Sequence, residues 1–511
     1  MLPENFLWGV SQSGFQFEMG DRLRRHIDPN TDWWYWVRDE YNIKKGLVSG
    51  DLPEDGINSY ELYERDQEIA KDLGLNTYRI GIEWSRVFPW PTTFVDVEYE
   101  IDESYGLVKD VKISKDALEK LDEIANQREI IYYRNLINSL RKRGFKVILN
   151  LNHFTLPIWL HDPIESREKA LTNKRNGWVS ERSVIEFAKF AAYLAYKFGD
   201  IVDMWSTFNE PMVVVELGYL APYSGFPPGV MNPEAAKLVM LHMINAHALA
   251  YRMIKKFDRK KADPESKEPA EIGIIYNNIG VTYPFNPKDS KDLQASDNAN
   301  FFHSGLFLTA IHRGKLNIEF DGETFVYLPY LKGNDWLGVN YYTREVVKYQ
   351  DPMFPSIPLI SFKGVPDYGY GCRPGTTSKD GNPVSDIGWE VYPKGMYDSI
   401  VAANEYGVPV YVTENGIADS KDVLRPYYIA SHIEAMEEAY ENGYDVRGYL
   451  HWALTDNYEW ALGFRMRFGL YEVNLITKER KPRKKSVRVF REIVINNGLT
   501  SNIRKEILEE G

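Results

Sequence analysis

The chain has 511 residues, of which 44% are hydrophobic and 26% charged, a composition typical of a soluble globular protein. Its formal net charge of −12 argues against a nucleic acid or an anionic membrane as a partner, because both attract basic proteins. The single cysteine, Cys372, excludes an intrachain disulfide and any cysteine-based metal site, and we expect its thiol to be buried.

The first residues, Met1 to Phe6, lack the basic and apolar regions of a signal peptide. No apolar run approaches the roughly 20 residues that a membrane helix needs. We therefore expect a cytoplasmic enzyme with no membrane partner. Lys and Glu are abundant while Gln is scarce, a bias that favours a heat-adapted source.

Apolar, β-rich runs recur along the chain, and each is followed by a helical pattern. They cover 6–12, 77–84, 146–153, 202–208, 271–277, 335–342, 409–414 and 446–453. These eight units predict an α/β protein, a single (β/α)8 TIM barrel over residues 1–511. A doubly wound open sheet would favour a G-x-G-x-x-G loop after the first strand, and residues 11–16 contain none.

Helix boundaries are marked by capping residues. Ser183 and Glu186 predict a capping box for a helix that ends at Gly199, and Pro426 predicts the start of a helix that runs toward Gly443. Long insertions follow four of the strands, so we expect them at the C-terminal face of the barrel, where active sites are built. They are 21–56, 86–113, 214–232 and 344–394, whereas the charged segment 256–271 precedes a strand and predicts a loop on the opposite face.

Polar and aromatic residues fall where the predicted strands end. They are Arg79, His153, Asn209, Glu210, Asn340, Tyr342, Glu414 and Trp452. Each one alone is more often structural, but a barrel would aim all of them into one pocket. Glu210 and Glu414 are the strongest indication of function, because paired carboxylates facing one cleft are the groups that split a glycosidic bond.

Several short motifs resemble glycoside hydrolase family 1, in the order found in that family and over nearly the whole chain. They are Phe6–Gly9, Trp84–Arg86, Thr207–Pro211, Asn340–Tyr342, Thr413–Gly416 and Asp456–Trp460. Within the family the chain resembles the archaeal branch, and its β-mannosidases in particular. One departure is Phe154, since the family often has Trp after the His that ends the third strand.

The resemblance implies a role for each of these positions. Glu414 would be the nucleophile and Glu210 the acid and base of a retaining mechanism, supported by Arg79, Tyr342 and Asn340. Arg79 would favour the ionised form of Glu414, and the charge of Glu414 would keep Glu210 protonated. The implied substrate-binding residues are Gln16, His153, Asn209, Glu459 and Trp460 for hydroxyl groups, Trp452 and Phe468 for the sugar face and exocyclic carbon, and Trp389 for the aglycone.

The resulting hypothesis is a retaining exo-β-glycosidase that removes a terminal β-linked hexose from small β-glycosides or oligosaccharides. β-Mannosidase is the first specificity, with β-glucosidase or β-galactosidase as the alternative. Glu459 would repel a 6-phosphate and so disfavours phospho-β-glycosides. A rival of another class is an inactive sugar-binding barrel, and a lyase with a Schiff-base Lys is disfavoured because Lys146 begins its strand. We expect no metal and no cofactor, and the resemblance implies a homotetramer.

Overall fold

The computed structural model describes residues 2–509. Eight parallel strands close into a barrel in the order β1-β15-β14-β11-β7-β6-β5-β2. Their bounds are β1 Leu7–Ser11, β2 Thr77–Gly81, β5 Lys146–Asn152, β6 Met204–Asn209, β7 Ile272–Asn277, β11 Trp336–Asn340, β14 Val410–Glu414 and β15 Val446–His451. Each lies within or overlaps one predicted run, so the (β/α)8 fold is confirmed.

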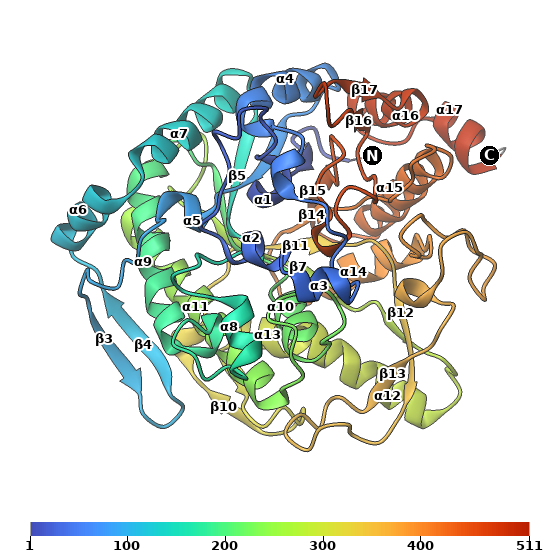
Figure 1. Cartoon of the computed structure of the whole chain (residues 1–511). Helices are drawn as coiled ribbons and strands as arrows, with labels where there is room; N and C mark the ends of the chain where they lie inside the picture. Colours follow the sequence, from blue (N-terminus) through green and yellow to red (C-terminus); the bar gives the residue numbers. More distant parts are fainter. Residues whose placement is uncertain (1, 510–511) are drawn as a thin grey trace.

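A ring of helices surrounds the barrel (Figure 1). One main helix follows each barrel strand, and the eight are α4 Ser59–Asp72, α7 Gln127–Lys142, α9 Glu181–Phe198, α11 Pro233–Phe257, α13 Leu306–Arg313, α14 Lys394–Asn404, α15 Arg425–Glu441 and α16 Lys484–Ile495. The other α-helices are α1 Gly14–Phe17, α2 Asp32–Trp36, α3 Glu40–Lys44, α5 Trp84–Val87, α6 Lys115–Ile124, α8 Pro163–Glu168, α10 Pro211–Tyr219, α12 Ser290–Asn300 and α17 Ser501–Ile503.

Alternation along the strands divides the apolar residues into two sets. One set packs outward against the helices and forms the main core, as Val147 and Leu149 do on β5. The other fills the barrel interior, where Ile148, Met204 and Trp336 belong to one buried cluster. This part of the interior is therefore packed with apolar side chains.

The remaining strands form small sheets outside the barrel. They are the hairpin β3 Glu98–Asp102 and β4 Leu107–Lys112, the sheet of β8 Thr282–Pro284, β12 Glu345–Tyr349 and β13 Phe362–Gly364, and the pairs β9 Lys315–Asn317 with β10 Phe325–Tyr327 and β16 Tyr471–Val473 with β17 Arg480–Pro482. In the described part of the chain, no helix is long and apolar enough to cross a membrane.

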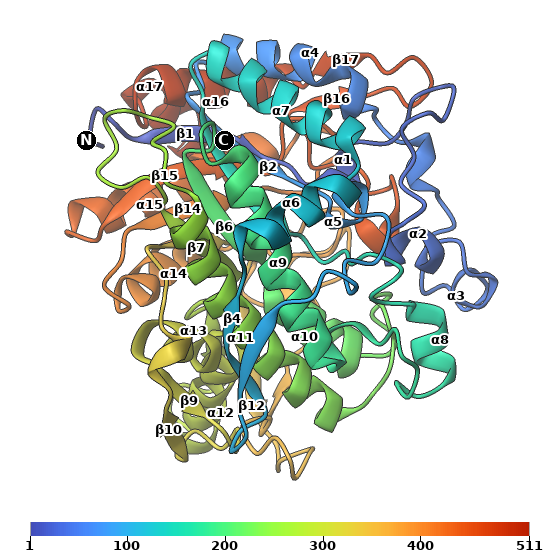
Figure 2. The same ribbon diagram turned by 90° about the vertical axis from the view of Figure 1, so that its left-hand side faces the viewer.

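The β3–β4 hairpin corrects one expectation, because the 86–113 insertion does not lie wholly on the C-terminal face. The hairpin runs along the outside of α9 and α11 (Figure 2). The Asn245 side chain of α11 exchanges two hydrogen bonds of 2.7 Å with the backbone of Val108. These bonds satisfy buried backbone groups and fasten the hairpin to the helix.

Two local predictions were also wrong. Helix α9 is capped by Ser180, whose side chain accepts from the backbone N–H of Arg182, and not by Ser183. Ser183 is the third residue of this helix and its hydroxyl donates to the Gly177 carbonyl, so Ser183 and Glu186 form no capping box. The Cys372 thiol is half-buried rather than buried. The expected loop between α11 and β7 is present at 258–271.

Candidate active site

Strand ends bring the predicted polar residues to one end of the barrel. Asn209, Asn340 and Glu414 are the last residues of β6, β11 and β14, and Asn340 is the register partner of Glu414. Arg79 lies inside β2 and is fully buried. Because all barrel strands run parallel, their carboxyl ends share one face, as a TIM-barrel active site requires.

Glu414 is held by one partner at each carboxylate oxygen. Arg79 Nη1 lies 2.6 Å from Oε1, and Tyr342 Oη donates to Oε2 at 2.6 Å. Burial and the charge of Glu414 raise the pKa of Tyr342 well above its usual range, so this hydroxyl remains a donor. A cation at one oxygen and a hydroxyl donor at the other therefore hold the Glu414 side chain in a fixed position.

Glu210 occupies a different environment. It is the first residue after β6, in the left-handed region with φ 49°, and it precedes Pro211, which opens α10. Asn340 Nδ2 donates to Glu210 Oε1 at 2.7 Å. Burial, followed by the charge of Glu414, raises the pKa of Glu210 to about 8. This carboxyl is therefore mostly protonated at neutral pH, which a general acid requires.

The two carboxyl groups are joined by a continuous chain of hydrogen bonds. Arg79 Nη2 donates to Asn209 Oδ1 at 2.8 Å, and Asn340 Nδ2 donates to the same oxygen at 2.9 Å. Because a guanidinium can only donate, Arg79 fixes which end of the Asn209 amide is the oxygen. That choice fixes the Asn340 amide in turn, so its N–H group is directed at Glu210.

His153 extends this chain toward the aromatic residues. Asn209 Nδ2 lies 3.1 Å from His153 Nε2. Burial and the nearby charge of Arg79 lower the pKa of His153 well below its usual range, so the ring is neutral. The ring stacks on Trp452 and Trp460, with centroids 6.0 and 5.8 Å away. A neutral imidazole between two indoles suits an uncharged polyol.

Glu459 and Trp460 lie on the loop that follows β15, and the same loop meets Gln16. Gln16 Nε2 donates to Asn457 Oδ1 at 3.2 Å and to the Tyr458 carbonyl at 3.0 Å. No described protein group hydrogen-bonds Glu459 Oε2, although that atom is buried. Burial, followed by the charge of Glu414, raises the pKa of Glu459 to about 8. An acceptor of this kind is matched by a ligand hydroxyl group.

The remaining predicted aromatic residues form one cluster beside Tyr342. The Trp389 and Phe468 rings lie 5.5 and 6.0 Å from the Tyr342 ring, and Trp452 belongs to the same cluster. Phe154, the departure from the family pattern, packs against Trp460 at 5.0 Å. Most predicted site residues thus belong to the hydrogen-bond chain or to the aromatic walls, whereas Gln16 and Glu459 meet at the loop after β15.

Two supporting residues were missed by the sequence analysis. Thr413 Oγ1 donates to Asn340 Oδ1 at 2.8 Å and completes the amide chain. Glu83 accepts from the Phe15 backbone N–H at 2.9 Å and from Thr155 Oγ1 at 2.6 Å, and so links the segments that carry Gln16 and His153. The signal for Thr413 was its place before Glu414. For Glu83 it was an acidic residue directly after an apolar strand.

Beside Glu83 lies a buried acidic cluster. Glu18 pairs with Arg86 at 2.6 Å, and Asp28 accepts from Ser85 Oγ at 2.6 Å. Burial, followed by the charge of Glu18, raises the pKa of Glu83 to about 8, and burial raises the pKa of Glu18 to about 7. The cluster therefore holds protons that the unfolded chain would release.

One group outside the site has the composition of a cation site. In the described part of the chain, ligand atoms of Asp21, His26 and Glu61 lie within 4.8 Å of one another. Arg25 pairs with Glu61 at 2.6 Å, and Arg128 Nη2 lies 2.7 Å from His26 Nδ1. Guanidinium groups already neutralise these ligands, and the group includes no predicted site residue.

A TIM barrel with two glutamates at its strand ends, one contacted by an arginine and a tyrosine and the other with a raised pKa, is typical of a glycoside hydrolase. The family model "Glycosyl hydrolase family 1" matches residues 1–96 and 122–499, and the chain belongs to that family. The unmatched segment includes the whole β3–β4 hairpin. The hairpin therefore lies outside the part of the chain that the family model describes.

Known proteins support this assignment along the full length. The chain is 79% identical over 508 residues to a β-galactosidase of Pyrococcus woesei, covering 99% of this chain and 100% of that protein. The solved β-glycosidase from the hyperthermophile Thermosphaera aggregans matches at 42% identity and a TM-score of 0.88, over 98% of both chains. A β-glucosidase mutant derived from a hyperthermophilic tetrameric structure matches at 41% identity and 0.86, over 98% and 97%.

Proposed function

We propose that this glycoside hydrolase is a retaining, exo-acting β-glycosidase with Glu414 as nucleophile and Glu210 as acid and base. The observation that carries the proposal is the inequality of the two carboxyl groups. Glu414 has a cation and a phenol at its oxygens, while Glu210 has one amide donor and a raised pKa. Such a difference assigns acid and nucleophile roles.

The proposed reaction has two steps. A Glu414 oxygen bonds to the anomeric carbon while the glycosidic C–O bond breaks and Glu210 gives its proton to the leaving oxygen. Esterification removes the charge of Glu414, so the pKa of Glu210 falls and this group becomes a base. Glu210 then takes a proton from water, whose oxygen bonds to the anomeric carbon as the ester bond to Glu414 breaks.

The sugar would be held by the groups around this pair. Gln16, His153, Asn209, Glu459 and Trp460 would bind its hydroxyl groups. Trp452 would stack on the ring, Phe468 would face the exocyclic carbon and Trp389 would meet the aglycone. The open acceptor of Glu459 supports this arrangement, because a buried carboxylate oxygen needs a hydrogen-bond donor.

For the sugar, the names of the relatives favour β-galactosidase or β-glucosidase activity. β-Mannosidase, which the sequence resemblance favours, differs from β-glucosidase only in the orientation of the 2-hydroxyl. The test is kcat/KM on aryl β-galactoside, β-glucoside and β-mannoside, with the first-formed anomer followed by NMR. A first-formed α anomer would overturn retention, and binding without turnover of any of the three would favour the sugar-binding alternative.

The relative described as derived from a tetrameric structure also supports a homotetramer for this chain. Light scattering of the purified protein tests this part of the proposal. A mass near 59 kDa, that of one chain, would contradict it.

A further inference from the structure

The loop 457–468 carries three of the proposed sugar contacts, Glu459, Trp460 and Phe468, and it is closed tightly at its base. Gly469 N–H donates to Asp456 Oδ1 at 3.0 Å, so the two residues that flank the loop touch. A Cβ atom on Gly469 would lie 2.1 Å from the Asp456 nitrogen, which no side chain allows. The position of this base therefore sets the position of the whole loop.

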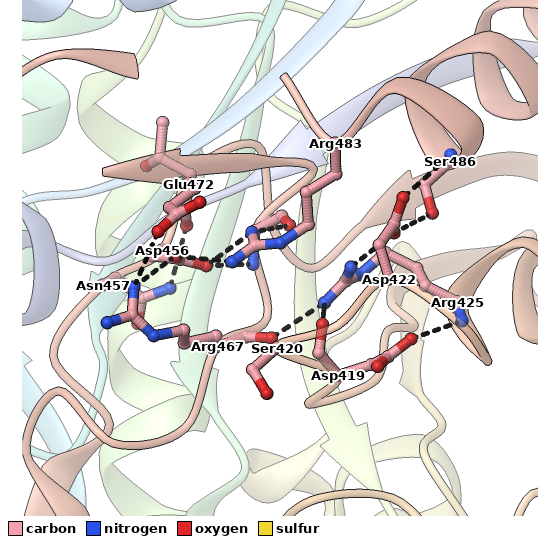
Figure 3. A network of polar contacts seen from close by, with 12 residues as sticks. Asp419, Ser420, Asp422, Arg425, Asp456, Asn457, Arg467, Glu472, Arg483 and Ser486 are labelled. Atoms are coloured by element: carbon pink, nitrogen blue, oxygen red, sulfur yellow. Dashed lines mark hydrogen bonds and ion pairs between the residues drawn. The ribbon is translucent and has the colours of Figure 1, made fainter. Parts of the chain in front are cut away.

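One arginine holds both sides of the base. Arg483 Nη1 and Nη2 each lie 2.9 Å from one oxygen of Asp456, and Nη1 also donates to the Gly469 carbonyl at 2.6 Å. Arg467, just before Phe468, adds a contact of 3.3 Å to Asp456 (Figure 3). The Arg483 and Asp456 side chains are only 6% and 9% exposed. A paired fork of this kind fixes direction as well as distance.

A second arginine fastens the same loop to the segment after Glu414. Arg425 Nη2 donates to the Arg467 carbonyl at 2.9 Å and to the Asp419 carbonyl at 2.7 Å. Asp419 N–H also donates to the Arg467 carbonyl at 3.1 Å. In Figure 3 the two arginines lie side by side, each turned toward its own aspartate. The loop is thus tied both to Arg483, the residue before α16, and to the segment between β14 and the start of α15.

We propose that Asp456 and Arg483 are positioning residues, which set the place of loop 457–468 and thereby of Glu459, Trp460 and Phe468 around the sugar. Neither residue needs to contact the substrate. This inference rests on the proposed function, because it takes those three side chains as sugar contacts. The substitution R483K would keep the positive charge but lose the bidentate hydrogen bonding to Asp456.

The chain offers a matched control in a second buried pair. Arg480 Nε and Nη2 lie 2.8 and 3.1 Å from the two oxygens of Asp66, and the side chains are 0% and 5% exposed. Arg480 is three residues before Arg483, but its partner is on α4 and neither residue contacts loop 457–468 in any hydrogen bond of the structure. Both are buried Arg–Asp pairs, but only the Arg483–Asp456 pair contacts the base of loop 457–468.

The experiment compares D456N with D66N and R483K with R480K against the wild type. We measure the thermal midpoint, kcat and KM on the best aryl glycoside, and the Kd of the iminosugar deoxynojirimycin by calorimetry. Both Asn variants should lose stability. Only D456N should weaken iminosugar binding and raise KM, by roughly ten-fold or more since several sugar hydrogen bonds shift, and R483K should do so more than R480K.

Equal kinetics and equal Kd in D456N and D66N would overturn the inference and leave a stabilising ion pair only. If D456N does not fold, the comparison of R483K with R480K decides in the same way. If the wild type hydrolyses none of the aryl glycosides, the proposed function fails. The iminosugar Kd then still reports whether the pair positions the loop.

Discussion

Arg79 Nη1 lies 2.6 Å from Glu414 Oε1, and both side chains are almost entirely removed from solvent. The same guanidinium bonds Asn209 through its other terminal nitrogen. One residue thus compensates the charge of the proposed nucleophile and orients the amide chain that ends at the proposed acid. Its loss should affect both carboxyl groups.

The first prediction concerns this arginine. R79K keeps a positive charge but cannot reach both partners, so we expect kcat to fall by at least ~100-fold while the fold survives. R79M leaves Glu414 uncompensated and should cost about 3–5 kcal/mol of unfolding free energy. Steady-state kinetics and denaturant unfolding measure the two effects. Wild-type kcat in R79K would contradict the prediction.

The second prediction concerns pH. The pKa of Glu210 is raised from its ordinary value to about 8, and the acid must be protonated to act. kcat/KM should therefore be level only well below this pKa and decrease as the pH rises through about 8. E210Q should lack this alkaline limb in whatever activity remains. An alkaline limb with the same midpoint in E210Q would assign the titration to another group.

The third prediction separates the two glutamates by the leaving group. E210A should lose about 10²–10⁴-fold in kcat/KM on alkyl glycosides, and much less on dinitrophenyl glycosides, whose leaving group needs no proton. E414A should be inactive on both classes. Azide should restore E414A with an inverted product and E210A with a retained one, as analysed by NMR. The reverse stereochemistry would exchange the two assignments.

The fourth prediction concerns Glu459. Its unpartnered oxygen should bind a sugar hydroxyl, so E459Q should raise KM, and kcat/KM should fall about 10–100-fold. Above its raised pKa of about 8 the ionised Glu459 carboxylate should also repel a 6-phosphate, so at alkaline pH E459Q should narrow the preference for aryl glycosides over their 6-phosphates. Trp389→Phe, a change on the proposed aglycone side, is the control and should leave that ratio unaltered.

The fifth prediction concerns stability. The pKa of Glu83 in the folded protein is about 8, above its ordinary value of 4.5, so the native state binds an extra proton between these values. Its contribution is fully present below pH 4.5 and is lost as the pH rises through about 8. E83Q imitates the protonated group, so its thermal midpoint should fall less between pH 5 and 8. E68Q, a substitution at an exposed position, is the control, and its thermal midpoint should change with pH as that of the wild type does.

Most of the barrel could be predicted from sequence because buried parallel strands are apolar on both faces. All eight runs became strands, although β2 ends at Gly81 and β15 at His451, before the predicted ends. The failures were local. The Ser183–Glu186 spacing fits a capping box, but Ser180 is the cap and the helix begins at Glu181, a choice between two nearby serines that their spacing does not decide.

The candidate site could be predicted as a set of residues but not as a network. Strand ends and motifs placed Glu210, Glu414 and Arg79 together. The direction of the Asn209 and Asn340 amides could not be predicted, because it depends on which neighbour donates. The protonation of Glu83 could not be predicted either, because its pKa is raised by burial and by the nearby charge of Glu18.

The β3–β4 hairpin is a part of the molecule that lies apart from the candidate active site. It lies outside the residues that match the family model, and its turn, from Glu103 to Gly106, is largely exposed. It is docked on α11 through Asn245, away from the strand ends that carry the glutamates. A reactive tag inserted in this turn would anchor the enzyme to a solid support with its catalytic end still facing the substrate.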